Sequence, residues 1–179
     1  MLDSDSIQLK SLIIFLLILS GNTCDSQAVF SPLSCQDLEN RTITFPTTEG
    51  SNTVVVITFS DNAEEQLKTW IDPLYQKFVA KSGMLDGLFN ADIKLLSFVS
   101  VAQLAVIKMN ASAIKKDLPA PLVNSVLYTT SSPDNVKVQI SFKNEKTVYV
   151  LVLSPEGKIL KQVSGAFTED KMESIEDVL

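Results

Sequence analysis

The sequence predicts an α/β domain in which a central mixed β-sheet is flanked by helices. The β-branched run 53–59 is apolar enough to be buried on both faces, as a central strand of a helix-covered sheet is, and residues 93–99 form a second apolar strand. Each run is followed by a segment whose apolar residues recur at helical spacing. Turn residues divide further apolar runs into one hairpin near each end of the domain. This alternation of strands and helices is typical of the α/β class.

The first elements are an N-terminal β-hairpin and a strand that leads into a helix. Glu39-Asn40 predicts the hairpin turn, and the second hairpin strand alternates polar and apolar residues until Pro46 ends it. After the buried run 53–59, Asp61 precedes Glu64 by three residues, which is the spacing of a capping box at a helix start. Pro73 inside this helix predicts a kink. Its apolar stripe comprises Leu67, Trp70, Ile71, Leu74, Tyr75 and Phe78.

The second half of the domain repeats this pattern and ends in a hairpin and a helix. Ser100 and Gln103 again have capping-box spacing, and Pro119 and Pro121 end the helix that follows. Strict alternation over Val136–Phe142 predicts one extra strand with a solvated face. The turn Ser154–Gly157 joins two strands, 148–153 and 158–163, into the last hairpin. Thr168 caps a final helix whose Met172, Ile175 and Val178 face inward.

The N-terminus has the layout of a secretory signal peptide. The apolar run 12–19 follows Lys10 and is followed by small and polar residues up to Ala28. We therefore expect residues 1–28 to be removed, leaving one domain over 29–179 that is exported to the periplasm or secreted. The run is short for a transmembrane helix, so retention as a membrane anchor is the weaker alternative.

Composition excludes several classes of function. With 15 basic and 21 acidic residues, a net charge of −6 and no basic cluster, nucleic acid is not an expected partner. The chain has no histidine, so serine–histidine and cysteine–histidine nucleophile pairs are excluded. Cys24 and Cys35 are too far apart for a CxxC pair and too few for a zinc site. We expect neither a metal nor another cofactor.

Three stretches carry a resemblance to a known superfamily. They are SCQDLENRTITFP, VVVITFSDNAEEQLKTWIDP and YVLVLSPEGKILKQVSGAFTEDKMESI, and together they cover most of residues 35–179. Their order resembles the thioredoxin-like superfamily, especially its exported and peroxiredoxin-related branches. The resemblance implies a reactive cysteine at the turn between the central strand and the first helix, and a cis-proline before the last hairpin. Neither is present: the turn is Ser60, Asp61, Asn62, Ala63 and Glu64, and Lys146-Thr147 stand in the place of the cis-proline.

A narrower similarity is to the cysteine-free, thioredoxin-like assembly factor family of the mitochondrial ATP synthase. That family also has phenylalanine-serine ahead of the first helix, as Phe59-Ser60 do here. It also has a late strand–turn–strand followed by a glycine and an acidic helix. This similarity implies a role without redox chemistry.

The preferred interpretation is an exported, redox-inactive thioredoxin-like domain that binds a protein or peptide, or helps an envelope protein to assemble. The resemblance places the binding groove near residues 60–64 and Lys146-Thr147. The rival interpretation is a one-cysteine thiol peroxidase or reductase acting through Cys35, although a lone cysteine in a hairpin is more often a small apolar core residue. A third is a membrane-anchored structural protein that retains its N-terminal segment.

Three charged or aromatic features have a structural interpretation that we prefer. Asp61, Glu64 and Glu65 could be an acid–base pair or a cation site, but acidic residues are expected in a first helical turn. Trp70 could mark a binding surface, but its place in the apolar stripe favours the core. Lysines 108, 115 and 116 could dock an acidic partner, but are more simply a solvated helix face.

Overall fold

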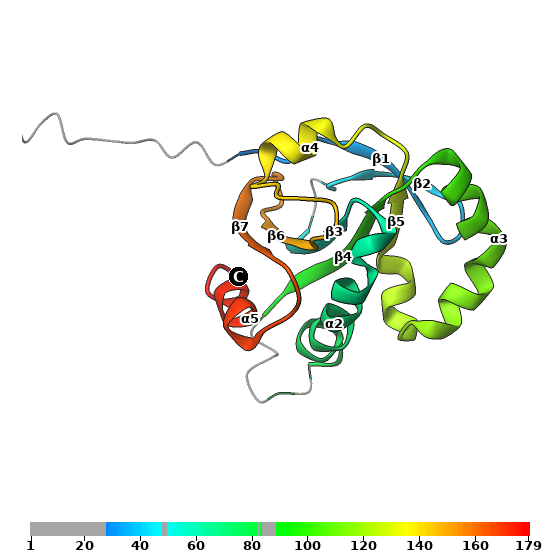
Figure 1. The fold of residues 1–179 in the computed structure, drawn as a ribbon. Helices are drawn as coiled ribbons and strands as arrows, with labels where there is room; N and C mark the ends of the chain where they lie inside the picture. The colour runs from blue at the N-terminus through cyan, green and yellow to red at the C-terminus, as the bar shows by residue number, and fades with distance from the viewer. Residues whose placement is uncertain (1–27, 48–49, 82, 84–88) are drawn as a thin grey trace, which may run out of the picture.

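The structure, a computed structural model, describes residues 28–47, 50–81, 83 and 89–179. Figure 1 shows a mixed sheet with helices on both of its faces, in the strand order β2-β1-β5-β4-β3-β6-β7. The strands are β1 (Leu33–Asp37), β2 (Thr42–Phe45), β3 (Asn52–Thr58), β4 (Ala91–Phe98), β5 (Val126–Thr129), β6 (Tyr149–Leu153) and β7 (Ile159–Ser164). The helical elements are η1 (Asp61–Ala63), α2 (Glu64–Leu74), η2 (Tyr75–Ala80), α3 (Val101–Asp117), η4 (Ala120–Ser125), α4 (Asp134–Gln139) and α5 (Glu169–Glu176). The predicted fold class is confirmed.

Most of the predicted leader lies outside the described residues. Ala28 is described, and its carbonyl accepts a hydrogen bond from the Ile159 backbone N–H at 2.9 Å. The predicted removal of residues 1–28 stays a prediction. In the described part of the chain, no helix is both long enough and apolar enough to cross a membrane.

The connections between strands decide which helices cover which face of the sheet. Strands β3, β4 and β5 are parallel neighbours, whereas β6 is antiparallel to β3. The connections through α2 and α3 run in one direction across the sheet, and both helices cover the same face, together with α5. The return from β5 to β6 runs through α4, which covers the opposite face. We call these the α2 face and the α4 face.

The sheet is buried on both faces because its central strands are almost wholly apolar. Val54 and Val56 of β3 face the α2 side, and Val55 and Ile57 face the α4 side, all four with no solvent exposure. Trp70, Leu74 and Phe78 pack on the α2 face, as the predicted stripe requires. The kink predicted at Pro73 stays a prediction, and the winding changes from α-helical to π-helical at Tyr75.

The predicted strand at Val136–Phe142 is wrong, because residues 134–139 form helix α4. Val136 and Ile140 are buried four residues apart, on one side of the helix, while Val138 is 86% exposed. The additional strand is instead β5, for which no strand was predicted, and it lies between β1 and β4.

The β1–β2 turn is held by the buried carboxylate of Asp37. Its Oδ1 accepts hydrogen bonds from the backbone N–H groups of Glu39 (2.8 Å) and Arg41 (2.9 Å), and its Oδ2 accepts one from Arg41 Nε at 2.6 Å. Burial alone would raise the pKa of Asp37, but these hydrogen bonds outweigh it and the pKa lies below its usual value. The ionised carboxylate is therefore the form that the fold stabilises.

We expect Asp37→Asn to lower the free energy of unfolding by about 1–3 kcal/mol at pH 7, because an amide accepts these hydrogen bonds less well and brings donors of its own. Since the folded pKa is depressed, the contribution of Asp37 is present above its unfolded pKa of about 4 and is lost as the pH falls through the folded pKa. Urea unfolding at pH 7 and pH 3 checks this. Glu39→Gln is the control: its side chain is 48% exposed and its contacts with Arg41 and Lys115 are 3.4 and 3.7 Å long, so little change is expected. Equal losses for the two variants would contradict the prediction.

Candidate functional site

The turn between β3 and α2, residues 60–64, is the position where the superfamily resemblance places its chemistry. Ala63 is fully buried, whereas Asp61, Asn62 and Glu64 are exposed. The predicted capping box at Asp61 is wrong, since neither η1 nor α2 has a side-chain cap. The Asp61 carboxylate instead accepts a hydrogen bond from Gln103 Nε2 at 2.9 Å.

Gln103 thereby links the starts of two helices. Its Oε1 accepts from the Ser100 backbone N–H at 2.8 Å, and its own N–H donates to Ser100 Oγ at 3.2 Å, which completes the capping box predicted for α3. Its remaining amide donor holds Asp61. The first turn of α3 is thus fixed to the turn that precedes α2.

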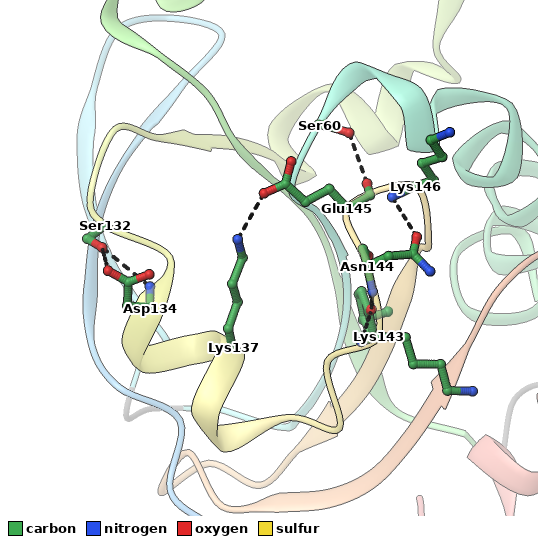
Figure 2. Close-up of polar contacts among 9 residues, drawn as sticks. Ser60, Ser132, Asp134, Lys137, Lys143, Asn144, Glu145 and Lys146 are labelled. Carbon is green, nitrogen blue, oxygen red and sulfur yellow. Dashed lines mark hydrogen bonds and ion pairs between the residues drawn. The ribbon is translucent and has the colours of Figure 1, made fainter.

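The loop before β6, residues 143–147, lies against the same turn, as Figure 2 shows. Ser60 Oγ donates to the Glu145 carbonyl at 2.9 Å. Asn144 Oδ1 accepts hydrogen bonds from the Lys146 N–H (2.9 Å) and the Thr147 hydroxyl (3.1 Å). The structure therefore brings the two halves of the predicted groove together, although Ala63 is buried and Asn62 does not line the cleft described next.

A cleft of about 390 Å³ opens beside the turn, between α2 and α3, at the carboxyl ends of the parallel strands β3, β4 and β5. Ligands of open α/β sheets bind at this edge. The turn contributes Ser60, Asp61 and Glu64 to the rim, whereas Lys146 and Thr147 do not line the cleft. The apolar residues that line it are Leu67, Ile71, Leu95, Phe98, Val99, Ile107, Ile114, Leu118 and Val126.

The cleft has an apolar floor and an acidic rim. The rim carries three carboxylates, those of Asp61, Glu64 and Asp117, and one lysine, Lys68. Lys68 pairs with Glu64 and Glu65, both at 3.0 Å, and these two carboxylates raise its pKa. The rim keeps an excess of negative charge, which favours an apolar ligand with a basic end. Among the described residues, no group of three or more histidine, cysteine or acidic side chains is arranged to hold a metal ion.

Comparison with known proteins identifies the family. The sequence profile of the ATP10 protein family matches residues 22–179. The chain belongs to the ATP10 family. This agrees with the narrower similarity drawn from the sequence. A search of curated protein sequences finds no match.

Solved structures similar to this ATP10-family chain confirm the thioredoxin-like fold. BsSco, a member of the Sco family of cytochrome c oxidase assembly proteins, matches with a TM-score of 0.57 and 15% identity over 86% of this chain and 94% of its own. The exposed lipoprotein thioredoxin Etrx1 from Streptococcus pneumoniae matches at 0.53 and 10%, covering 82% and 99% of the two chains. A thiol:disulfide interchange protein DsbE from Chlorobium tepidum matches at 0.52 and 14%, covering 84% and 92%.

Cys35, the cysteine that the rival interpretation requires, lies away from the cleft. It is fully buried in the core on the α4 face, in the edge strand pair β1–β2. Burial raises the pKa of the thiol from 9.0 to about 11. The neutral thiol is therefore the form present at neutral pH, whereas nucleophilic chemistry needs the thiolate.

We expect Cys35 in the native protein to resist alkylation at pH 8. A folded pKa of about 11 leaves roughly 100-fold less thiolate than an ordinary cysteine has, and burial slows access further. Because the unfolded chain ionises first, the contribution of this thiol to stability falls as the pH rises from about 9 towards 11. The Cys24→Ser variant, treated with iodoacetamide before and after unfolding in urea, isolates the Cys35 signal. Rapid labelling of the folded protein would contradict the prediction.

The contacts that hold the loop 143–147 could not be predicted from the sequence. Lys137 of α4 pairs with Glu145 at 3.0 Å and lies over the rings of Phe59 (5.4 Å) and Phe142 (4.7 Å), which fixes α4 to the 143–147 loop. The hydroxyl of the buried Tyr149 accepts hydrogen bonds from the Lys143 and Asn144 N–H groups at 2.7 and 3.0 Å. Tyr149 and Lys137 therefore hold the loop against the turn, beside the cleft but outside its lining.

Proposed function

We propose that the protein is a redox-inactive, thioredoxin-like assembly factor that binds an apolar segment of a client protein in the cleft between α2 and α3. One observation carries the proposal: a cleft with an apolar floor adjoins the turn where the superfamily has its cysteine, and that turn has none. Cys35, the cysteine that lies within the described residues, is buried on the other face of the sheet. Such a site can bind, and it has no thiolate with which to exchange disulfides.

We propose a subunit of the ATP synthase as the client. Membership of the ATP10 family supports this, through the resemblance to the ATP synthase assembly factor. The cleft supports a membrane subunit in particular, because an apolar floor suits a hydrophobic segment and the carboxylates of the rim suit the lysine or arginine that commonly flanks such a segment. BsSco, a fold neighbour, is likewise described as belonging to a family of assembly proteins.

The location follows as part of the same proposal. Export to the periplasm or cell envelope is our proposal from the apolar run 12–19, and fold neighbours such as the exposed lipoprotein Etrx1 support it. ATP10-family membership supports a mitochondrial setting as the alternative. In either case the domain works beside a membrane that carries an ATP synthase.

Site-specific crosslinking tests the proposal. A photoreactive residue placed at Leu67 in the cleft of the full chain should crosslink to an ATP synthase membrane subunit in the native membrane. The same residue at Val138, exposed on the α4 face, should not. Identical crosslinking patterns at the two positions would reject the cleft as the binding site.

An activity assay addresses the rival interpretation. We expect the reduced protein to turn over neither peroxide nor the disulfides of insulin. Turnover that disappears in Cys35→Ala would replace the binding function with a thiol enzyme. Membrane fractionation and the intact mass of the native protein decide whether the N-terminal segment is retained.

A further inference from the structure

Helix α3 has apolar residues on two opposite sides. On its inner side Ile107, Ile114 and Leu118 pack against the core of the α2 face. On its outer side Val101, Val106 and Met109 are 75%, 58% and 85% exposed. The exposed alanines at positions 102, 105 and 113 lie between them at helical spacing. We call these six residues the outer stripe of α3.

The outer stripe is unlike the solvated side of α2. The exposed side of α2 carries Glu64, Glu65 and Lys68, as expected of a helix that packs on a sheet with one face only. Although α3 has 17 residues, none of them is buried, and Figure 1 places the helix at the outside of the molecule. A helix that is apolar on both sides is expected to have a second partner.

The charges beside the outer stripe are positive, on a chain whose net charge is −6. Lys108 lies at one margin of the stripe and Lys116 at its carboxyl end, and neither forms an ion pair within the described residues. Lys115, by contrast, faces the domain and pairs with Glu39 at 3.7 Å. Acidic residues are absent from α3 before its last residue, Asp117. The surface therefore complements an apolar layer bordered by negative charge.

A lipid surface fits this stripe better than a protein does. A helix of 17 residues is about 26 Å long, so a stripe about 10 Å wide covers roughly 250 Å², well below the 800 Å² or so per partner of a stable protein interface. The stripe also lacks the tryptophan, tyrosine and arginine residues that dominate protein binding. An interfacial helix binds through the apolar area that it buries and through the attraction of its lysines to anionic lipids.

We propose that the outer stripe of α3 lies on the surface of a membrane that contains anionic lipids, with Val101, Val106 and Met109 among the acyl chains. Lys108 and Lys116 then contact the phosphate groups. This contact does not depend on the client proposed above, since the stripe is on the side of α3 opposite the cleft.

A fluorophore attached to the stripe tests this in the full chain. A local probe is needed because the 12–19 run can bind vesicles by itself. In a Cys24→Ser, Cys35→Ala background, an environment-sensitive dye is placed at Met109→Cys or, as a matched control, at Val138→Cys, which is equally exposed but on the α4 face. With vesicles of phosphatidylcholine and phosphatidylglycerol, we expect a blue shift at position 109 and none at position 138.

Charge and partner controls complete the test. Adding Lys108→Gln and Lys116→Gln should weaken the response at position 109 by roughly 30-fold in vesicle concentration, because each lysine near an anionic surface contributes about 1 kcal/mol. An unchanged spectrum at position 109 with vesicles would overturn the proposal. So would a blue shift that depends only on protein concentration, which indicates a second copy, or one seen only with a protein extract of the native membrane.

Discussion

Replacing Trp70 with alanine is expected to lower the free energy of unfolding by about 3–5 kcal/mol, the range measured for large-to-small changes at buried aromatic residues. Trp70 has no solvent exposure and packs edge-to-face against Phe167 with ring centroids 5.3 Å apart. Its Nε1–H donates to the Gly165 carbonyl at 2.9 Å, which ties α2 to the segment after β7. Since small domains are stable by only about 5–15 kcal/mol, this change removes a large part of the total.

Two further variants separate the contributions at this site. Trp70→Phe keeps most of the apolar volume but leaves the Gly165 carbonyl without its donor, so a smaller loss of about 1–3 kcal/mol is expected. Val138→Ala, at an exposed apolar position, should change the stability by no more than about 0.5 kcal/mol. Urea unfolding followed by far-ultraviolet circular dichroism measures all three without relying on tryptophan emission. A loss for Trp70→Ala no greater than for Val138→Ala would show that the packing is misassigned.

The position of Trp70 could be predicted because its helix follows simple rules. The stripe of α2 has a 3.6-residue period, and β3 and β6 are mostly apolar because both of their faces are covered. The hairpin turns also follow from local residues, such as Pro155 and Gly157, the latter with a φ of 78°. Where the local pattern and the tertiary environment agree, the sequence is a sufficient guide.

The errors arise where tertiary contacts decide between two local alternatives. Residues 136–142 alternate as a strand does, yet the domain needs a helix there to cover the α4 face on the way from β5 to β6. The β5 strand has four residues and gains its stability from pairing with β1 and β4 on either side. Asp61 has the spacing of a helix cap, but its carboxylate instead accepts a hydrogen bond from Gln103, 42 residues later in the sequence. None of these choices is encoded within a short window.

In the candidate cleft too, the residues of one local turn could be predicted, whereas residues that come together from distant parts of the sequence could not. Ser60, Asp61 and Glu64 were predicted from the turn, since a resemblance fixes where a strand meets a helix. The floor of the cleft could not be predicted, because it is built from buried and half-buried residues of α2, α3 and three strands, which share no motif. The apolar side of α3 was recognised as a packing stripe, but its distance from the sheet, which leaves the cleft open, depends on the whole domain.

A charge placed on either wall of the cleft is expected to weaken client binding by roughly 100-fold, or about 2.7 kcal/mol. Leu67→Asp changes the α2 wall and Ile114→Asp the α3 wall, and both side chains are half-buried at the cleft surface. When an apolar ligand binds, an aspartate there would lose its hydrating water without gaining a hydrogen bond or an ion pair, which costs free energy. It would also add to the negative charge of the rim. Titration of each full-length variant with the client segment, followed by fluorescence anisotropy, measures the effect.

The control for this experiment must separate a blocked cleft from a disturbed fold. Val138→Asp adds the same charge at an exposed apolar site on the α4 face, and should leave affinity unchanged. Thermal unfolding of each variant shows whether the domain is intact. A rim variant, Asp117→Asn, should weaken binding of a segment with a basic end but not of the same segment with that end neutralised, because the carboxylate acts only on the charge. If both wall variants bind as the native protein does while remaining folded, the client contacts another surface, and the cleft is only a gap in packing.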